Sequence, residues 1–275
     1  MIITLYGTRG SIPVCDEGFQ EFGGNTTCFS IYRHDTKTIA IIDAGTGIRN
    51  LGKDMMKNPD KQKTITVGFT HFHWDHIQGF PFFLPAYDKN TNLSIMSVGE
   101  TSESELRSIL QGQMQSEYFP IPMSKMGGNF TYTNLGLDYV AVNGIRVKMI
   151  KQNHPGISYG VRIELDEQSL VICTDVEHDD EISEDFIEFC KDADLLFHDA
   201  QYTDEELELH RGWGHSSYNQ AMEVAERSNA RMLVMTHHDP DHNDEFLRKQ
   251  EKICQERFKF CELAREGSKY DIADF

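Results

Sequence analysis

The sequence predicts an α/β protein in which two sheet-and-helix halves stack as a sandwich of sheets with helices outside. Runs rich in β-branched and aromatic residues, separated by turn residues, recur along the chain and predict strands. Segments with helical spacing lie between these runs, and the same rhythm occurs in both halves. Strands that alternate with helices place the helices on the outer faces of the sheets. No linker, low-complexity tract or charge run divides the halves, so residues 1–275 are expected to form one domain.

The first half is predicted to contribute four strands and two helical segments. The strands are expected at 2–6, 28–33, 38–43 and 64–69. Residues 103–114 have the apolar spacing of a helix. The stretch IQGFPFFLPAY (77–87) begins a helix that Pro81 and Pro85 interrupt, because proline lacks the N–H of a helix interior. Residues 115–135 contain two prolines and two glycines and are interpreted as a loop.

The second half repeats strands and helices. A strand meander is predicted between 142 and 175, with Asn143-Gly144 as a hairpin signal. The later elements are a helix at 181–193, a strand at 194–200, a helix at 216–230 capped by Ser216 or Ser217, and a strand at 231–238. The last 30 residues are predicted to form a helix followed by an irregular tail.

The charge balance limits the classes of partner. The net charge is −18, because 26 Lys and Arg residues stand against 44 Asp and Glu residues, and no basic cluster is evident. Proteins that bind long nucleic acids through phosphates usually have a basic stripe, so the charge disfavours nucleic acid and favours a small anionic substrate. No apolar run approaches the roughly 20 residues of a membrane-spanning helix, so no membrane partner is expected.

The N-terminal stretch and the cysteines predict a cytoplasmic protein. MIITLYGTRGSIPV (1–14) has neither the basic region nor the apolar region of a secretory signal. The six cysteines are widely spread and form no CxxC pair. Without an export signal they are expected to be reduced thiols.

The stretch THFHWDHIQGF (70–80) concentrates metal-binding side chains, namely His71, His73, Asp75 and His76. His71 and His73 lie two apart in an extended segment, so their side chains project to the same side. Asp75 and His76 begin the following helix and can face a neighbouring position. Imidazole and carboxylate without thiolate suit zinc, with manganese or iron as alternatives. The cluster can therefore supply ligands to two divalent metal ions.

Further polar residues lie at the ends of other predicted strands or in the loop after one. They are Asp43, His154, Asp175 and His237. The ends of neighbouring strands meet at one edge of a sheet, where functional sites collect on a rigid scaffold. Without the first cluster, His154 and His237 would each be interpreted as an ordinary loop histidine and not as a metal ligand. Asp43 has a second interpretation as a turn-forming residue before Gly45.

Together these residues resemble the metallo-β-lactamase superfamily of binuclear metallohydrolases. The resemblance rests on HFHWDH with Asp43 upstream, His154 in NHPG, Asp175 in ICTD and His237 in MTHH. GTRGS (7–11), NTT (25–27) and GHSS (214–217) look closest to the tRNase Z and phosphodiesterase branch. The resemblance implies the fold of that superfamily, an αββα sandwich of two mixed sheets flanked by helices.

The resemblance also implies a set of metal ligands. The first metal would be held by His71, His73 and His154, the second by Asp75, His76 and His237, and Asp175 would bridge the two. Asp43 would support the ligands by hydrogen bonding, which orients imidazoles at metal sites. His238 directly follows His237 and stays open as the alternative ligand at that strand end.

His215 and Asp199 are the remaining candidate catalytic residues. In similar tRNase Z-like proteins the histidine of GHSS lies near the scissile phosphate and pairs with an acidic residue. Here HDAQ (198–201) would provide Asp199 for that role, with His198 as a structural residue. His215 would then protonate the leaving oxygen, unless it is an ordinary residue at a helix N-terminus.

These parts predict a metal-dependent hydrolase, and a small phosphodiester such as a cyclic nucleotide is the favoured substrate. Alternatives are an RNA or DNA nuclease of the tRNase Z type and a non-catalytic metal-dependent protein that binds a phosphorylated ligand. His at position 73 disfavours the redox chemistry of flavin-linked di-iron relatives, and Asp at position 175 disfavours β-lactam hydrolysis. No long Gly/Pro-rich arm like that of tRNase Z is visible.

The segment 84–130 has three open interpretations. It contains Tyr118, Phe119, Pro120 and Met123, which could cover the core, form a lid or form a dimer contact. A homodimer is expected from the resemblance alone.

Overall fold

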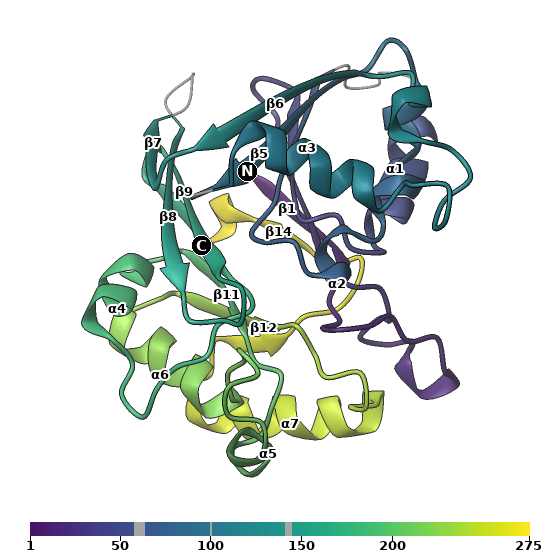
Figure 1. The fold of residues 1–275 in the computed structure, drawn as a ribbon. Coiled ribbons are helices and arrows are strands. Elements are labelled where there is room, and N and C mark those ends of the chain that lie inside the picture. The colour runs from purple at the N-terminus through teal and green to yellow at the C-terminus, as the bar shows by residue number, and fades with distance from the viewer. Residues whose placement is uncertain (58–63, 100, 141–144) are drawn as a thin grey trace.

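The computed structural model of the protein describes residues 1–57, 64–99, 101–140 and 145–275. Two β-sheets face each other, and helices cover both outer faces (Figure 1). This arrangement confirms the predicted αββα sandwich. Within the described ranges, no helix combines the length and the apolar character needed to cross a membrane.

The first sheet contains, among the described residues, seven strands with a mixed arrangement. Their order is β14 (Lys269–Asp271), β1 (Ile2–Gly7), β2 (Cys28–Arg33), β3 (Thr38–Ile42), β4 (Thr64–Gly68), β5 (Asn92–Val98) and β6 (Asn129–Leu135). Neighbours from β14 to β3 are antiparallel, and neighbours from β3 to β6 are parallel. Helices α1 (Ile48–Lys57) and α3 (Glu103–Gly112) bury their apolar faces against its outer side.

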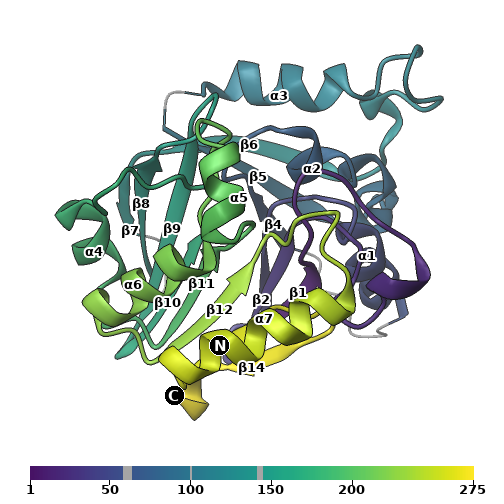
Figure 2. The same cartoon turned by 90° about the horizontal axis from the view of Figure 1, so that it is seen from below.

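The second sheet also has seven described strands. Their order is β13 (Cys261–Leu263), β12 (Met232–Thr236), β11 (Leu195–Asp199), β10 (Gln168–Cys173), β9 (Ser158–Leu165), β8 (Arg146–Gln152) and β7 (Asp138–Val140). The strands from β13 to β10 are parallel, and those from β10 to β7 are antiparallel. Figure 2 shows α6 and α7 beside this sheet. The helices of this half are α4 (Glu184–Cys190), α5 (Asp204–Leu209), α6 (Tyr218–Ser228) and α7 (Asp244–Arg257).

The space between the sheets is filled by apolar side chains from both. Phe197 on β11 is fully buried and lies edge-on to Phe29 of β2 at 5.1 Å and to Tyr270 of β14 at 5.5 Å between ring centroids. Aromatic pairs in this geometry stabilise a core beyond the burial of their surface. These rings therefore connect the two sheets.

Replacing Phe197 with alanine is expected to destabilise the protein by about 3–5 kcal/mol, because the cavity between the sheets cannot fully close. Urea unfolding followed by circular dichroism measures this change. Phe260, which is exposed, provides the matched control, since its replacement by alanine removes the same atoms from the surface. Equal effects of the two substitutions would contradict the assignment of Phe197 to the core.

Several local predictions need correction. The loop predicted at 115–135 is wrong at its end, where β6 pairs in parallel with β5 and packs Phe130 and Tyr132 under α3. The predicted irregular tail is also wrong, because β13 and β14 extend both sheets. The helix begun at 77–87 becomes short α2 (Trp74–Ile77) and two 3₁₀ turns that carry Pro81 and Pro85. The Asn143-Gly144 hairpin lies outside the described residues.

Candidate metal centre

The donors lie just after the carboxyl ends of strands from both sheets. Asp43 follows β3, Asp175 follows β10 and His237 follows β12, and all three have left-handed backbone with φ of 63°, 59° and 63°. Non-glycine residues in this conformation are uncommon and cluster at functional sites. The abrupt turn at each strand end directs these side chains toward the space where the sheets meet.

The first group of donors contains only imidazoles. One nitrogen from each of His71, His73 and His154 lies within 4.8 Å of the others. His154 Nε2 is 3.0 Å from His73 Nδ1, and the His71 ring centroid lies 4.6 Å and 4.9 Å from the rings of His73 and His154. His71 and His154 are buried, whereas His73 is exposed. The group is therefore open to solvent on the side of His73.

The second group combines carboxylates with imidazoles. One donor atom from each of Asp75, His76, Asp175 and His237 lies within 4.8 Å of the others, and all four residues are buried. Asp75 Oδ2 is 3.2 Å from His237 Nε2 and 3.4 Å from His76 Nε2. Mixed imidazole and carboxylate donors at this spacing suit a divalent cation.

Asp175 lies between the two groups. Its Oδ2 is 3.1 Å from His76 Nε2, and its Oδ1 is 3.3 Å from His237 Nε2. The same Oδ1 is 3.7 Å from His71 Nε2 and 3.9 Å from His154 Nε2. A carboxylate within reach of both groups has the position that a bridging ligand requires.

Two buried nitrogens show that the donor groups fit cations. Among the described residues, His71 Nε2 and His76 Nε2 make no hydrogen bond of acceptable geometry. A buried polar atom without a partner costs about 1–3 kcal/mol. A cation within each group would satisfy both nitrogens, because neutral imidazole binds divalent metals through this atom.

The charges of the second group point to the same conclusion. Burial opposes the charged form of Asp175, but His237, His76 and His71 outweigh it and hold the pKa of Asp175 well below its usual range. Burial likewise opposes the imidazolium of His237, but the carboxylates led by Asp175 raise its pKa to about 9. The carboxylates of the second group are therefore stabilised by protonated imidazoles. A bound cation can supply the same positive charge in place of those protons.

Comparisons with known proteins identify the family of the chain. The sequence profile of the beta-lactamase superfamily domain matches residues 39–238, which hold every donor described above. The chain belongs to the metallo-β-lactamase superfamily. It is 25% identical to ribonuclease Z of Sulfurisphaera tokodaii over 258 residues, which cover 80% of this chain and 85% of that protein. As a member of this superfamily, the chain is a metal-dependent hydrolase.

Solved structures of the superfamily share the fold. YhfI from Bacillus subtilis superposes with a TM-score of 0.72 at 18% identity, and the match covers 98% of each chain. The short form of human tRNase Z superposes with a TM-score of 0.70 at 19% identity, and the match covers 99% of each chain. The metallo-β-lactamase architecture therefore extends over nearly the whole chain.

Asp43 contacts the second donor group through His76. Its Oδ2 accepts hydrogen bonds from His76 Nδ1 at 2.9 Å and from the Thr70 hydroxyl at 2.8 Å, and its Oδ1 accepts one from the Thr70 N–H at 2.8 Å. This contact directs His76 Nε2 into the second group. These hydrogen bonds are the ones that the supporting role implied by the resemblance requires, and the role itself stays a prediction.

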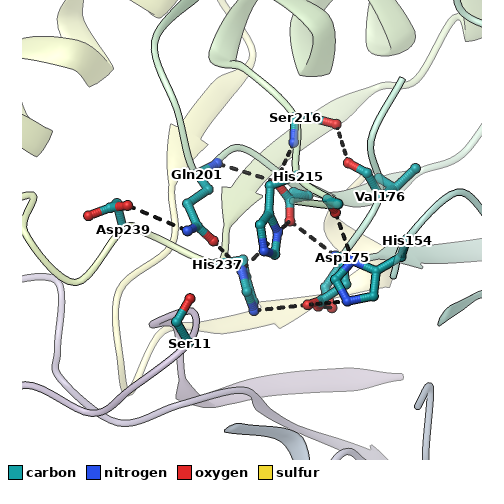
Figure 3. Close-up of polar contacts among 12 residues, drawn as sticks. Ser11, His154, Asp175, Val176, Gln201, His215, Ser216, His237 and Asp239 are labelled. Carbon is teal, nitrogen blue, oxygen red and sulfur yellow. Dashed lines mark hydrogen bonds and ion pairs between the residues drawn. The ribbon is translucent and has the colours of Figure 1, made fainter. Parts of the chain in front are cut away.

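Two further supporting residues were not predicted from the sequence. Gln201 Oε1 accepts a hydrogen bond from His237 Nδ1 at 2.9 Å, and Gln201 Nε2 donates to Asp239 at 3.4 Å (Figure 3). The backbone N–H of Ser11 donates to Asp75 Oδ2 at 2.8 Å. The sequence signal for Gln201 is its place two residues after Asp199, whereas Ser11 acts through its backbone and has no signal of residue type.

Replacing Gln201 with leucine is expected to lower the affinity for zinc by about 10–100-fold, because the His237 ring loses the partner that orients it. Competition with a chromogenic chelator measures this affinity. Gln220, a half-buried glutamine in α6 that caps its own helix, is the matched control. If both leucine variants bind zinc like the wild-type protein, Gln201 does not orient a ligand.

Zinc affinity is expected to rise with pH up to about 9, because a metal ion must displace the proton from His237, whose pKa is raised to that value. Calorimetric titration in buffers of different ionisation enthalpy measures the number of protons released. Proton release should be present at pH 7 and should diminish above pH 9. Uptake of zinc without proton release at pH 7 would show that His237 is not a ligand.

His215 and Asp199 form a buried pair beside both donor groups. Asp199 Oδ2 accepts a hydrogen bond from His215 Nδ1 at 2.9 Å, and Asp199 Oδ1 accepts from Ser216 N–H at 2.9 Å. The His215 ring stacks on His237 at 4.9 Å between centroids and lies 5.4 Å from His154 (Figure 3). The shorter aspartate side chain therefore reaches His215 directly.

The loop before His215 is held by Glu177, which sequence reasoning missed. The Glu177 carboxylate accepts hydrogen bonds from Gly212 N–H at 2.8 Å and Gly214 N–H at 2.7 Å. The carbonyl of Gly214 accepts a hydrogen bond from His154 Nδ1 at 2.9 Å. This loop thus positions His215 and orients His154 at the same time.

Three other histidines contact groups outside the donor groups, namely His238, His242 and His198. His238 Nε2 donates to the carbonyl of Ala264 at 2.8 Å, and burial together with Arg9 lowers the pKa of His238 to about 3. His242 pairs with Glu206 at 2.9 Å. His198 contacts His178, with 3.1 Å between their Nε2 atoms. The geometry therefore favours His237 over His238 as the donor at the end of β12.

Proposed function

We propose that the protein is a binuclear metal-dependent phosphodiesterase that hydrolyses a small phosphodiester. The observation that carries the proposal is the position of Asp175 between two groups of donors, with His215 adjoining both. One donor atom each from His154, Asp175 and His215 lies within 4.8 Å of the others. An acid group next to a pair of cation sites is the arrangement that cleavage of a phosphodiester requires.

The ligand assignment divides the donors between two divalent ions. His71, His73 and His154 would hold one ion, Asp75, His76 and His237 the other, and Asp175 both. Zinc is the expected metal, with manganese or iron as competitors, because the donors are imidazoles and carboxylates. When bound, the ions supply Lewis-acid chemistry, which neutralises charge on phosphoryl oxygens and makes a water molecule a nucleophile near neutral pH.

The residues of the chain supply orientation and proton transfer. Asp175 keeps the two donor groups in register, because it approaches His76 of the second group and His71 of the first. His215 carries a proton on Nε2 to the oxygen of the departing alcohol, while Asp199 holds its Nδ1. An alkoxide is a poor leaving group, so this proton matters most for natural esters.

A small substrate, such as a cyclic nucleotide, fits the charge of the molecule. The net charge of −18 opposes long polyanions, while cations at the donor groups attract a single phosphate locally. The similarity to ribonuclease Z supports a second candidate, an RNA nuclease of the tRNase Z type. The free cysteines support a cytoplasmic setting.

The test is a hydrolysis screen with protein of known metal content. Bis(p-nitrophenyl) phosphate should be cleaved with zinc bound, and cleavage should stop after chelation and return with added zinc. Cyclic nucleotides and a 3′-extended precursor tRNA are assayed in parallel to separate the two candidates. Saturable turnover of the cyclic nucleotides supports the phosphodiesterase, and saturable turnover of the tRNA supports the nuclease. Activity that survives complete removal of metal would contradict the binuclear assignment.

A further inference from the structure

A cavity of about 740 Å³ opens beside His71 and His73. This volume is in the range of pockets that bind small molecules. Its walls beyond the donor groups are partly apolar, with Phe72, Ile109, Ile157 and Tyr159, and partly polar, with Thr101, Glu105 and Ser108. Among the described residues that line it there is no Lys or Arg, and Glu105 is the one carboxylate.

Both sheets contribute to the cavity. Phe72 follows β4, and α3 presents Glu105, Ser108 and Ile109 from the first half. Tyr159 reaches from β9 of the second sheet to Gly99, where a Cβ would lie 1.9 Å from the tyrosine hydroxyl. A glycine at position 99 therefore leaves room for the Tyr159 ring in the wall of the cavity.

The turn after His154 places the Ile157 side chain in the wall of the cavity, with its backbone in an unfavourable conformation. Ile157 has φ of 68°, and its N–H donates to the carbonyl of His154 at 2.9 Å. A β-branched residue in the left-handed region is a genuine outlier, and such strain persists at ligand sites where the surroundings impose it. Ile157 therefore lines the cavity despite an unfavourable backbone conformation.

The polar wall can accept hydrogen bonds but offers no positive charge. Glu105 Oε2 accepts from the N–H of Ser102 at 2.8 Å and from its hydroxyl at 2.7 Å, as part of the capping box of α3. Glu105 Oε1 has no hydrogen-bond partner among the described residues. A second phosphate is disfavoured here, whereas a flat group with an N–H donor suits aromatic walls and a carboxylate.

We propose that this cavity binds a nucleobase with an exocyclic amine, as in adenosine, and that the amine donates to Glu105. The inference rests on the proposed function, because the base would belong to the phosphodiester held at the donor groups. The ring would lie against Phe72 and Tyr159, and the amine would face α3. Glu105 is then a specificity-determining residue for the reaction.

The test compares adenosine with purine riboside, which lacks only the amine, in saturation-transfer NMR titrations of the metal-loaded protein. Wild-type protein should bind adenosine about tenfold more tightly, because a hydrogen bond to a charged group is lost with purine riboside. Glu105→Gln should abolish this preference. The glutamine side chain has one oxygen, and this oxygen would keep the capping-box hydrogen bond with Ser102. Its N–H₂ group, which cannot accept a hydrogen bond from the amine, would then face the ligand.

Two further variants complete the design. Glu103→Gln, an exposed position in the first turn of the same helix, should keep the wild-type preference. Phe72→Leu should weaken both nucleosides by about tenfold, because stacking on an aromatic ring is lost. Thermal unfolding confirms that each variant is folded.

The outcomes separate this inference from the proposed function, because nucleosides carry no phosphate. Two results would overturn the base pocket. One is equal affinity of the wild-type protein for adenosine and purine riboside, and the other is binding of the cation choline when neither nucleoside binds. Cleavage of bis(p-nitrophenyl) phosphate without adenosine binding would overturn the pocket alone. Adenosine binding that depends on Glu105, without phosphodiester cleavage, would overturn the hydrolytic function and leave the pocket in place.

Discussion

Replacing Asp175 with asparagine is expected to abolish both metal loading and phosphodiester hydrolysis. Asp175 approaches imidazoles of both donor groups, at distances from 3.1 to 3.9 Å. Residues that merely orient a ligand already change metal affinity by about 10–100-fold, so removal of a charge shared by both groups should cost more than about 100-fold. Metal content by mass spectrometry and turnover of bis(p-nitrophenyl) phosphate measure the two losses.

Asp194→Asn is the matched control for Asp175→Asn. Asp194 is also a buried aspartate beside a strand of the second sheet, directly before β11, and it accepts a hydrogen bond from Ser169 N–H at 2.8 Å, outside the donor groups. This variant should keep metal and activity. An Asp175→Asn protein with two equivalents of zinc and wild-type turnover would remove the bridging assignment.

Replacing His215 with alanine is expected to lower turnover by about 10²–10⁴-fold for an alkyl phosphodiester, because general acid catalysis contributes that much. The same change should have little effect on bis(p-nitrophenyl) phosphate, whose p-nitrophenolate leaves without a proton. The measurement is therefore the ratio of kcat between the two substrates. A ratio that shifts strongly toward the activated ester identifies the proton donor.

Metal content distinguishes the two roles open to His215. Its distance from His154 and Asp175 would also allow it to hold an ion. A proton donor leaves zinc binding intact when replaced, whereas a ligand does not. Loss of zinc together with equal losses for both substrates would therefore reject the proposed role. His34→Ala, an exposed histidine, should change neither zinc content nor the ratio.

Features that depend on residues close in sequence were predictable, whereas strands that depend on a distant partner were not. The cluster at 70–80 was predictable because its donors are close in sequence, and the backbone geometry of a strand end fixes their directions. β6 was not predictable, because NFTYTNL is surrounded by turn residues and becomes a strand only by pairing with β5. β13 and β14 are three-residue strands that likewise depend on their partners.

The contacts of the supporting residues were likewise not predictable from the sequence. Gln201 and Ser11 are distant in sequence from His237 and Asp75, the donors that they contact. The place of Gln201 two residues after Asp199 does not reveal that it contacts His237, and Ser11 acts through its backbone. Glu177 is an acidic residue among many, and its contacts with Gly212 and Gly214 exist only because two loops meet. Such contacts depend on proximity that only the folded chain defines.

The amino-acid sequence by itself determined the chemistry of this protein: imidazole and carboxylate donors after strands, without thiolates, in a pattern that predicts a metal-dependent hydrolase. Only the tertiary structure decided between His237 and His238, because the left-handed turn after β12 sends one ring to the donors and the other to Ala264. It also places Asp175, the bridge that the resemblance implied, within reach of both groups. The physical reason is that residue type sets what a side chain can bind, whereas packing of distant segments sets what it can reach.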